Sequence, residues 1–335
     1  GDSIDEAFRA SRSGPEYVTL ETTAIAWMMC DNFLNGNIME YFEKQYAYKG
    51  HAKFVEIARL FGWGRLGDYF RSFNQDYENG TDPLEEEVDS LLLRLSVESG
   101  IDIRPLFHFW GVPPVDASAL DSSFQAANLP SSGLIYDTLV NYKSLVPPDN
   151  ASFRTFANGW WGRQPLSSGY SEERNHASRW DNYDAAMATA TANQAQAIID
   201  LYFPDGRPSD YGDWRSAWAA ANLVDPQSDL DGDGMSNGDE RIWGLDPTSS
   251  ASSSPLQHVT NLRNGSFSYT RRDQSLTGQS YSVWFSTDLS GWDEDTGAQQ
   301  IPGEPDSNGV QSVETILSPE LLDEPSLFIQ LRASE

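Results

Sequence analysis

The sequence predicts a multidomain α+β protein with an aromatic-rich helical bundle, an EF-hand-like calcium loop and a small C-terminal antiparallel β-sandwich. Three observations support this prediction. Apolar residues recur at helical spacing in several segments before residue 225, an acidic loop follows at 229–240, and apolar and polar residues alternate after residue 255. With 335 residues, 39% of them hydrophobic and 12% aromatic, the chain is long enough for two or three domains and a sizeable core.

Residues 1–115 are expected to form the helical bundle. A helix is predicted to begin at Asp82-Pro83, where aspartate can cap and proline fits the first turn, and to stop at Gly100. Two earlier stretches carry apolar side chains three and four residues apart, the spacing of a buried helix face: Phe54, Ile57, Ala58 and Phe61, and then Leu66, Tyr69, Phe70 and Phe73.

Residues 116–224 are expected to be a connector followed by a second helical region. The Pro/Ser/Asp-rich stretch 112–150 holds one amphipathic piece at 135–145, and a long helix is predicted to end at Pro204-Asp205-Gly206. Several tryptophans are candidates for stacking on sugar rings, although packing between helices is the simpler interpretation: Trp160, Trp161, Trp180 and Trp214.

The segment DLDGDGMSNGDE has the residue types and spacing of a calcium-binding loop within a predicted 225–250 element. Ca²⁺ takes six to eight oxygen ligands, which a short loop supplies by wrapping around the ion, with glycine at the sharp turn. Gly234 stands at that turn, and cysteine and histidine, which favour zinc or copper, do not occur in the loop. The predicted ligands are the backbone carbonyl of Met235 and the side chains of Asp229, Asp231, Asp233, Asn237 and Glu240.

The total charge narrows the classes of partner. With 50 acidic and 22 basic residues the net charge is −28, which repels nucleic acid and anionic lipid.

No stretch is apolar enough to span a membrane, and a single cysteine, Cys30, excludes an intrachain disulfide. The chain starts at Gly1 rather than Met, without a signal peptide, so a processed product or fragment is expected. A weak calcium loop needs millimolar Ca²⁺, which favours a secreted, extracellular or cell-surface location.

Two segments within residues 15–115 resemble segments of a known protein family. The segments KFVEIARLFGWGRLGDYFRSF and VDSLLLRLSVESGIDIRPLFHFWGVP resemble the helical C-terminal part of enhancin-like, mucin-directed zinc metallopeptidases, peptidase family M-sixty. In that family a Gly-Trp pair at a helix end precedes a Phe-x-x-Trp-Gly-hydrophobic-Pro segment. The matching residues here are Gly62-Trp63 and 107–113. The resemblance implies a glycoprotein substrate and an N-terminal catalytic portion of the same precursor.

The chain departs from that family at the catalytic site. Family catalysis uses H-E-x-x-H, with two histidines on zinc and a glutamate as general base. No two histidines of this chain lie four residues apart and none precedes a glutamate; they are His51, His108, His176 and His258. Glu16 stands one residue out of register with the third zinc ligand that the family uses. No catalytic residue is therefore assigned, and whether the chain belongs to an enzyme is left open.

The acidic loop and the segments after it resemble repeats and modules of other protein families. The acidic loop followed by a short helix and Gly-Leu-Asp-Pro at 244–247 resembles the thrombospondin type-three-like and dockerin-like repeats of large secreted bacterial proteins. Dockerins use a pair of such loops, and one is present here. After a Ser-rich linker, the alternating segments of residues 256–335 resemble the C-terminal β-modules of secreted bacterial enzymes.

Two functions follow from the sequence. The first is a calcium-binding secreted bacterial protein that forms the C-terminal portion of a glycoprotein- or mucin-directed metallopeptidase, with catalytic residues outside this chain. The alternative is a non-catalytic extracellular protein, stabilised by calcium, that binds glycans or builds a surface assembly. A hydrolase that uses paired carboxylates is a third, weaker hypothesis, because no acidic pair is singled out by its context.

Overall fold

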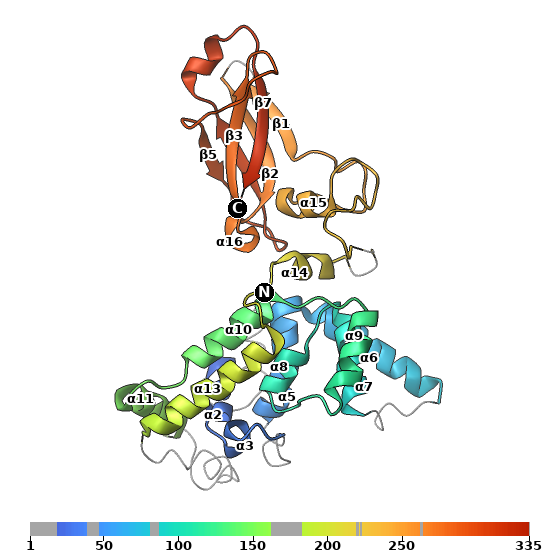
Figure 1. Cartoon of the computed structure of the whole chain (residues 1–335), viewed down its shortest axis with the longest axis vertical. Helices are drawn as coiled ribbons and strands as arrows, with labels where there is room; N and C mark the ends of the chain where they lie inside the picture. Colours follow the sequence, from blue (N-terminus) through green and yellow to red (C-terminus); the bar gives the residue numbers. More distant parts are fainter. Residues whose placement is uncertain are drawn as a thin grey trace. The chain divides into compact units, whose positions relative to one another are not determined.

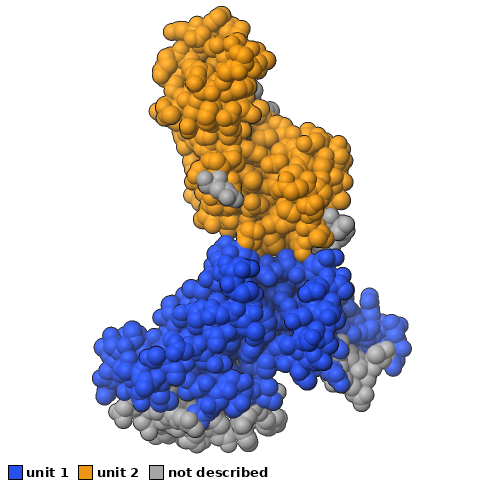
Figure 2. Space-filling view, viewed as in Figure 1, with its two compact units in different colours: residues 1–208 blue, residues 209–335 orange. Residues whose placement is uncertain are grey.

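The computed structural model describes residues 19–38, 47–80, 87–161, 183–218, 221, 223–261 and 264–334. The chain divides into two compact units, residues 1–208 and 209–335, which Figure 2 shows in different colours. We call them the helical unit and the β unit. Helices make up the described part of the first, and the second holds two small antiparallel sheets. The prediction of a mixed α and β protein is confirmed.

The described helices of the helical unit run in chain order through most of its length (Figure 1). Their bounds are α2 Leu20–Met28, α3 Asp31–Leu34, α5 Ala47–Phe61, α6 Trp63–Glu78, α7 Val88–Ser99, α8 Arg104–Phe109, α9 Ala117–Ala126, α10 Gly133–Ser144, α11 Asn150–Trp161 and α13 Ala185–Tyr202.

Local residues explain where several of these helices begin and end. Gly62, at φ +85°, separates α5 from α6, and Gly100 ends α7 in the left-handed conformation that glycine adopts without steric cost. Asp116 caps α9, where its side chain accepts a hydrogen bond from the N–H of Ala119. The sequence predicted a connector at 112–150 with one helical piece, and the structure places both α9 and α10 there. The predicted helix start at Asp82 lies outside the described residues.

One hydrophobic core runs through the helical unit. It includes buried residues from Leu20 to Phe203, so the predicted segments 1–115 and 116–224 do not form separate cores. Trp27 Nε1 donates a hydrogen bond to the carbonyl of Phe109 at 2.5 Å, and the rings of Phe109 and Tyr142 stack at 5.1 Å. Phe107, Phe109 and Trp110 are therefore buried packing residues, while His108 between them is half-buried.

A buried polar cluster lies within this core. Glu56 on α5 and Tyr142 on α10 are both fully buried, and the tyrosine hydroxyl donates to Oε2 of Glu56. Arg59 Nη2 lies 2.5 Å from Oε1 of Glu56, while its Nη1 lies 3.0 Å from Glu21 on α2. A buried carboxylate requires such partners. The cluster therefore links three helices.

The β unit contains short helices and all the strands of the described residues (Figure 1). Its elements are α14 Tyr211–Ser216, α15 Asn237–Trp243, β1 Leu256–Asn261, β2 Ser266–Arg272, α16 Gln274–Thr277, β3 Ser280–Ser286, β4 Asp293–Glu294, β5 Gln299–Pro302, β6 Val310–Ile316, a 3₁₀ turn at Pro319–Asp323, and β7 Phe328–Ser334. The sheet orders are β1-β2-β6-β5 and β4-β3-β7, with antiparallel neighbours throughout.

The two sheets share one hydrophobic cluster. Phe267 and Tyr269 come from β2, Val313 from β6, and Tyr281 and Val283 from β3. Their spacing of two places alternate side chains on the inner face of each strand, as the alternating sequence predicted. This alternation decides which side of each sheet faces the core.

Helix α15 packs against the same cluster. The Trp243 ring lies 5.5 Å from the Tyr281 ring and 6.1 Å from the Tyr269 ring, measured between centroids. The Tyr281 hydroxyl donates to the carbonyl of Ile242 at 3.0 Å. Helix α15 begins within the acidic loop, and its last residues, 241–243, form the short helical piece predicted before the linker and fix it to the sheets.

Candidate metal centre

The acidic loop 229–240 is folded by its own carboxylates. The two carboxylate oxygens of Asp229 accept hydrogen bonds from the N–H groups of Gly232 at 2.8 Å and Gly234 at 2.9 Å. One oxygen of Asp231 accepts from the N–H of Asp233, and one of Asp233 accepts from the N–H of Met235. Gly232 and Gly234 have φ values of +80° and +95°, which side chains rarely adopt. The loop therefore curls around its aspartates.

The three aspartates converge on one point. Asp229, Asp231 and Asp233 each offer a carboxylate oxygen, and these atoms lie within 4.8 Å of one another. The second oxygens of Asp231 and Asp233 are buried and accept no hydrogen bond from any described residue. Hydrogen bonds from the backbone of Gly234 and Gly232 lower the pKa of Asp229. That carboxylate is therefore charged at neutral pH.

Glu240 is the decisive residue of the site. It is 0% exposed, and neither of its carboxylate oxygens has a hydrogen-bond partner among the described residues. Burial, followed by the charges of Asp231, Asp233, Asp229 and Asp246, raises the pKa of Glu240 to about 7. A buried carboxylate beside other negative charges is costly unless a cation compensates it. The residues present therefore fit a divalent cation with oxygen ligands.

Helix α15 sets the position of Glu240. Ser236 caps the helix: its Oγ accepts from the N–H of Asp239 at 3.1 Å and lies 2.7 Å from that residue's carboxylate. Gly244 ends the helix at φ +69°, and a Cβ there would come within 2.7 Å of Val310 on β6. Both ends of the helix are thus fixed, which fixes the backbone position of Glu240 at the end of the loop.

Asn237 has a structural role in addition to its predicted ligand role. It is fully buried, its Nδ2 donates to the carbonyl of Asp225 at 2.9 Å, and its Oδ1 accepts from the N–H of Leu230 at 3.3 Å. The side chain thereby ties the start of the loop to α15. Met235 packs its side chain against the core of the β unit, and a ligand role for its carbonyl stays a prediction.

An ion-pair cluster beside the site was missed by sequence reasoning. Asp210 is 3% exposed and receives Arg241 of α15 on one oxygen and Arg272 of β2 on the other, the latter at 2.5 Å. These arginines stand 31 and 62 residues from Asp210 in the chain. No local pattern could have paired them. Arg241 directly follows Glu240, so this cluster anchors the helix that carries the glutamate.

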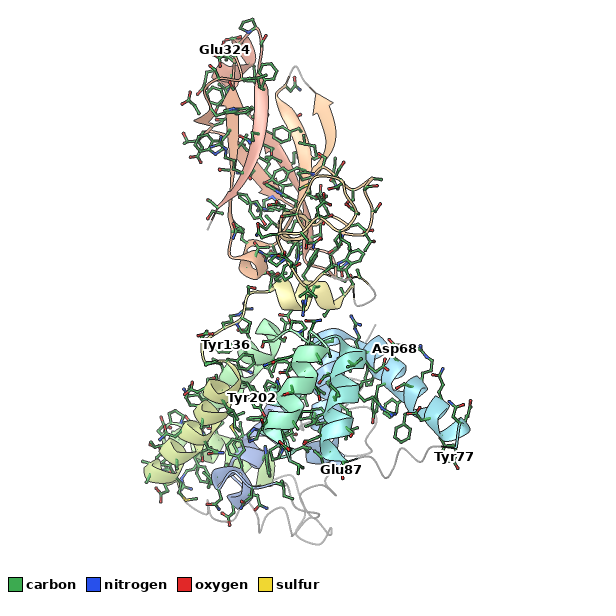
Figure 3. All side chains as sticks on the ribbon, turned by 45° about the vertical axis from the view of Figure 1, so that its right-hand side comes forward. Asp68, Tyr77, Glu87, Tyr136, Tyr202 and Glu324 are labelled. Carbon is green, nitrogen blue, oxygen red and sulfur yellow. The ribbon has the colours of Figure 1, made fainter. Side chains whose placement is uncertain are left out.

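The other candidates from the sequence do not assemble a second centre in the described part of the chain. His108 is half-buried with Nδ1 3.1 Å from the hydroxyl of Tyr202, a residue labelled on α13 in Figure 3, and burial lowers its pKa. Cys30 and Trp214 are buried. The remaining candidates lie outside the residues or side chains described: Glu16, His51, Trp160, Trp161, His176, Trp180 and His258. Within the described ranges, no helix combines the length and hydropathy needed to cross a bilayer.

Comparison with protein-family models, with curated proteins and with solved structures finds no match for this chain. The chemistry of the metal centre follows instead from its donor set. All its side-chain donors are oxygens, and the fully buried carboxylate of Glu240 has no hydrogen-bond partner in the described part of the chain.

Proposed function

We propose that the loop 229–240 binds one Ca²⁺ in a secreted protein. Carboxylate oxygens come from Asp229, Asp231, Asp233 and Glu240. The backbone carbonyl of Met235 supplies a further oxygen ligand. The ninth loop position, held by Asn237, contributes directly or through a bridging water, as is common in such loops. The observation that carries the proposal is the buried carboxylate of Glu240, which has no hydrogen-bond partner among the described residues and interacts with the charges of the three converging aspartates.

The donor set favours calcium over other metals. Hard oxygen ligands without histidine or thiolate suit Ca²⁺ and Mg²⁺ and disfavour zinc and copper. Mg²⁺ demands near-ideal octahedral geometry and keeps several waters, whereas Ca²⁺ accepts a flexible set that includes a bidentate carboxylate. Neither oxygen of Glu240 has a hydrogen-bond partner among the residues that the structure describes, which suits the bidentate arrangement.

Bound calcium would stabilise the β unit, which we interpret as a small antiparallel sandwich module. Glu240 shares α15 with Arg241, which pairs with Asp210, and with Trp243, which enters the hydrophobic cluster. A cation that binds Glu240 therefore stabilises a helix on which the surrounding packing depends. Because the ion binds only the folded loop, it shifts the folding equilibrium toward the folded unit.

For the whole protein we propose the C-terminal portion of a glycoprotein- or mucin-directed metallopeptidase, with the catalytic residues elsewhere in its precursor. The support is the motif at Gly62-Trp63 and 107–113 in the helical unit. The alternative is a non-catalytic extracellular protein that binds glycans or builds an assembly, and the position of β7 at the edge of its sheet among the described strands favours the assembly. An H-E-x-x-H encoded upstream of Gly1 would support the first, and its absence would support the second.

Isothermal titration of the desalted chain tests the metal proposal. We expect one Ca²⁺ per chain, with a weaker affinity for Mg²⁺. Glu240→Gln should lower the calcium affinity strongly, because it removes the charged bidentate ligand. Glu314→Gln, which makes the same change at an exposed position of β6, is the matched control and should bind as the parent does. Unchanged calcium binding in Glu240→Gln would refute the assignment.

A further inference from the structure

The edges of the two sheets differ in how they are protected against pairing. Edge strands expose unpaired N–H and C=O groups, and proteins protect them with short strands, proline, charged side chains (above all lysine) or bulges. Among the described strands the edges are β1, β5, β4 and β7. The pairing of β1 with β2 has two register shifts, β5 ends in Pro302, and β4 has two residues.

Strand β7 has only one of these protections, the single charged side chain of Arg332. Its seven residues pair with β3 in unbroken register from Phe328 opposite Ser286 to Ser334 opposite Ser280. The segment FIQLRAS contains no proline, lysine or glycine. Within the described part of the chain, no strand pairs with its other edge. That edge therefore presents a regular row of backbone donors and acceptors.

The side chains of β7 also show that its burial is incomplete. Ile329, Leu331 and Ala333 pack against the hydrophobic cluster of the β unit, yet all three remain partly exposed. Phe328 and Gln330, on the opposite face of the strand, are exposed. A further strand added at this edge would cover the inner apolar side chains and satisfy the backbone groups.

We infer that β7 is a self-association edge, at which two copies of this chain pair β7 with β7 in antiparallel orientation. The result is a continuous sheet with three strands from each copy. The partner is a second copy because the strand is complementary to itself. A two-fold axis at Leu331 keeps like faces together, since a shift by one residue would turn every side chain to the wrong face.

This register gives favourable cross-strand pairs. Leu331 lies opposite Leu331 and Ile329 opposite Ala333 on the inner face. Arg332 lies opposite Gln330 on the outer face, and the side-chain Oε1 of Gln330 already accepts hydrogen bonds from Arg332 of its own strand at 3.0 and 2.9 Å. No like charges oppose each other, although directly opposed like charges would destabilise the pair. The strand carries no acidic residue despite the net charge of −28.

Sedimentation velocity of the full chain in calcium, over a wide range of concentration, tests this inference. We expect a reversible monomer–dimer equilibrium. Gln330→Lys places a cation opposite Arg332 twice in each dimer, and should raise the dimer dissociation constant about tenfold. Gln330→Glu alters the same exposed position with the opposite charge, and should lower the dissociation constant. Circular dichroism melts check that both variants fold.

The inference does not depend on the metal proposal, so the two can fail separately. A parent chain that stays monomeric at every concentration would overturn the inference. So would a dimer that responds equally to the lysine and glutamate variants, because its interface would then lie elsewhere. Open-ended fibres would also contradict it, since pairing through one two-fold edge closes at a dimer.

Discussion

Nη1 of Arg272 lies 2.5 Å from Oδ2 of Asp210, and the other oxygen of that carboxylate binds Arg241, the residue after Glu240. A strand, the start of the β unit and the helix beside the acidic loop are thereby joined at one buried carboxylate. The candidate calcium site is consequently coupled to the packing of the strands rather than being an isolated surface loop.

Calcium should stabilise the β unit and leave the helical unit unchanged. At a calcium concentration one hundred times the dissociation constant the gain is about 2.7 kcal/mol. We expect chelation to lower the melting temperature of one calorimetric transition and to increase proteolysis near 247–255. Identical melts and digests with and without chelator would contradict the prediction.

Glu240→Gln should have opposite effects with and without calcium. Without metal, the variant removes a buried charge beside three aspartates and should be as stable as the parent or more so. With calcium, it should lose most of the stabilisation that the parent gains. Urea unfolding in chelator and in calcium gives the free energy of unfolding under each condition, with Glu314→Gln as the control. A variant that is destabilised equally in both conditions would point to a packing role instead.

Asp210→Asn should destabilise the β unit by about 3 kcal/mol, because removing one partner of a buried ion pair leaves uncompensated charge. It should also weaken calcium binding, since Arg241 anchors α15. Asp137→Asn is a suitable control: its pair with Arg207 is about half-exposed, and such pairs contribute under about 1 kcal/mol. Equal effects of the two substitutions in urea unfolding would argue against the role of Asp210.

Tyr142→Phe should destabilise the helical unit by about 1–3 kcal/mol, because it leaves an oxygen of buried Glu56 without its donor. Tyr77→Phe on α6 is the matched control, since Tyr77 is 69% exposed and is labelled in Figure 3. We expect the control to stay within about 0.5 kcal/mol of the parent. Urea unfolding, monitored through a signal from the helical unit, measures the change in unfolding free energy for each variant.

The helical unit should lose stability as the pH falls, in part through His108. Burial lowers the pKa of His108 in the folded state below its ordinary value of 6.5. The unfolded chain then takes up the proton first, so this contribution is complete above the unfolded pKa and is lost as the pH falls through the folded pKa. We expect His108→Gln to reduce the slope of unfolding free energy against pH between about 7 and 5. An unchanged slope would exclude His108 as a source.

How much the sequence determined depended on the range of the interaction. The breaks at Gly62 and Gly100, the alternation in β2 and the composition of the loop 229–240 could be predicted from neighbouring residues. Each reflects backbone conformation or side-chain period, which act over a few positions in the chain. The candidate ligands were found in the same way, because they share one short loop.

The tertiary structure decided what distant residues do together. It showed that residues from Leu20 to Phe203 share one core and that Asn237 ties the loop to α15. It also showed that Glu240 is buried without a hydrogen-bond partner in the described ranges. It also paired Asp210 with Arg272 and placed β7 at the edge of its sheet among the described strands. Burial, ion pairing and strand order depend on contacts between segments far apart in the chain, and no local propensity specifies them.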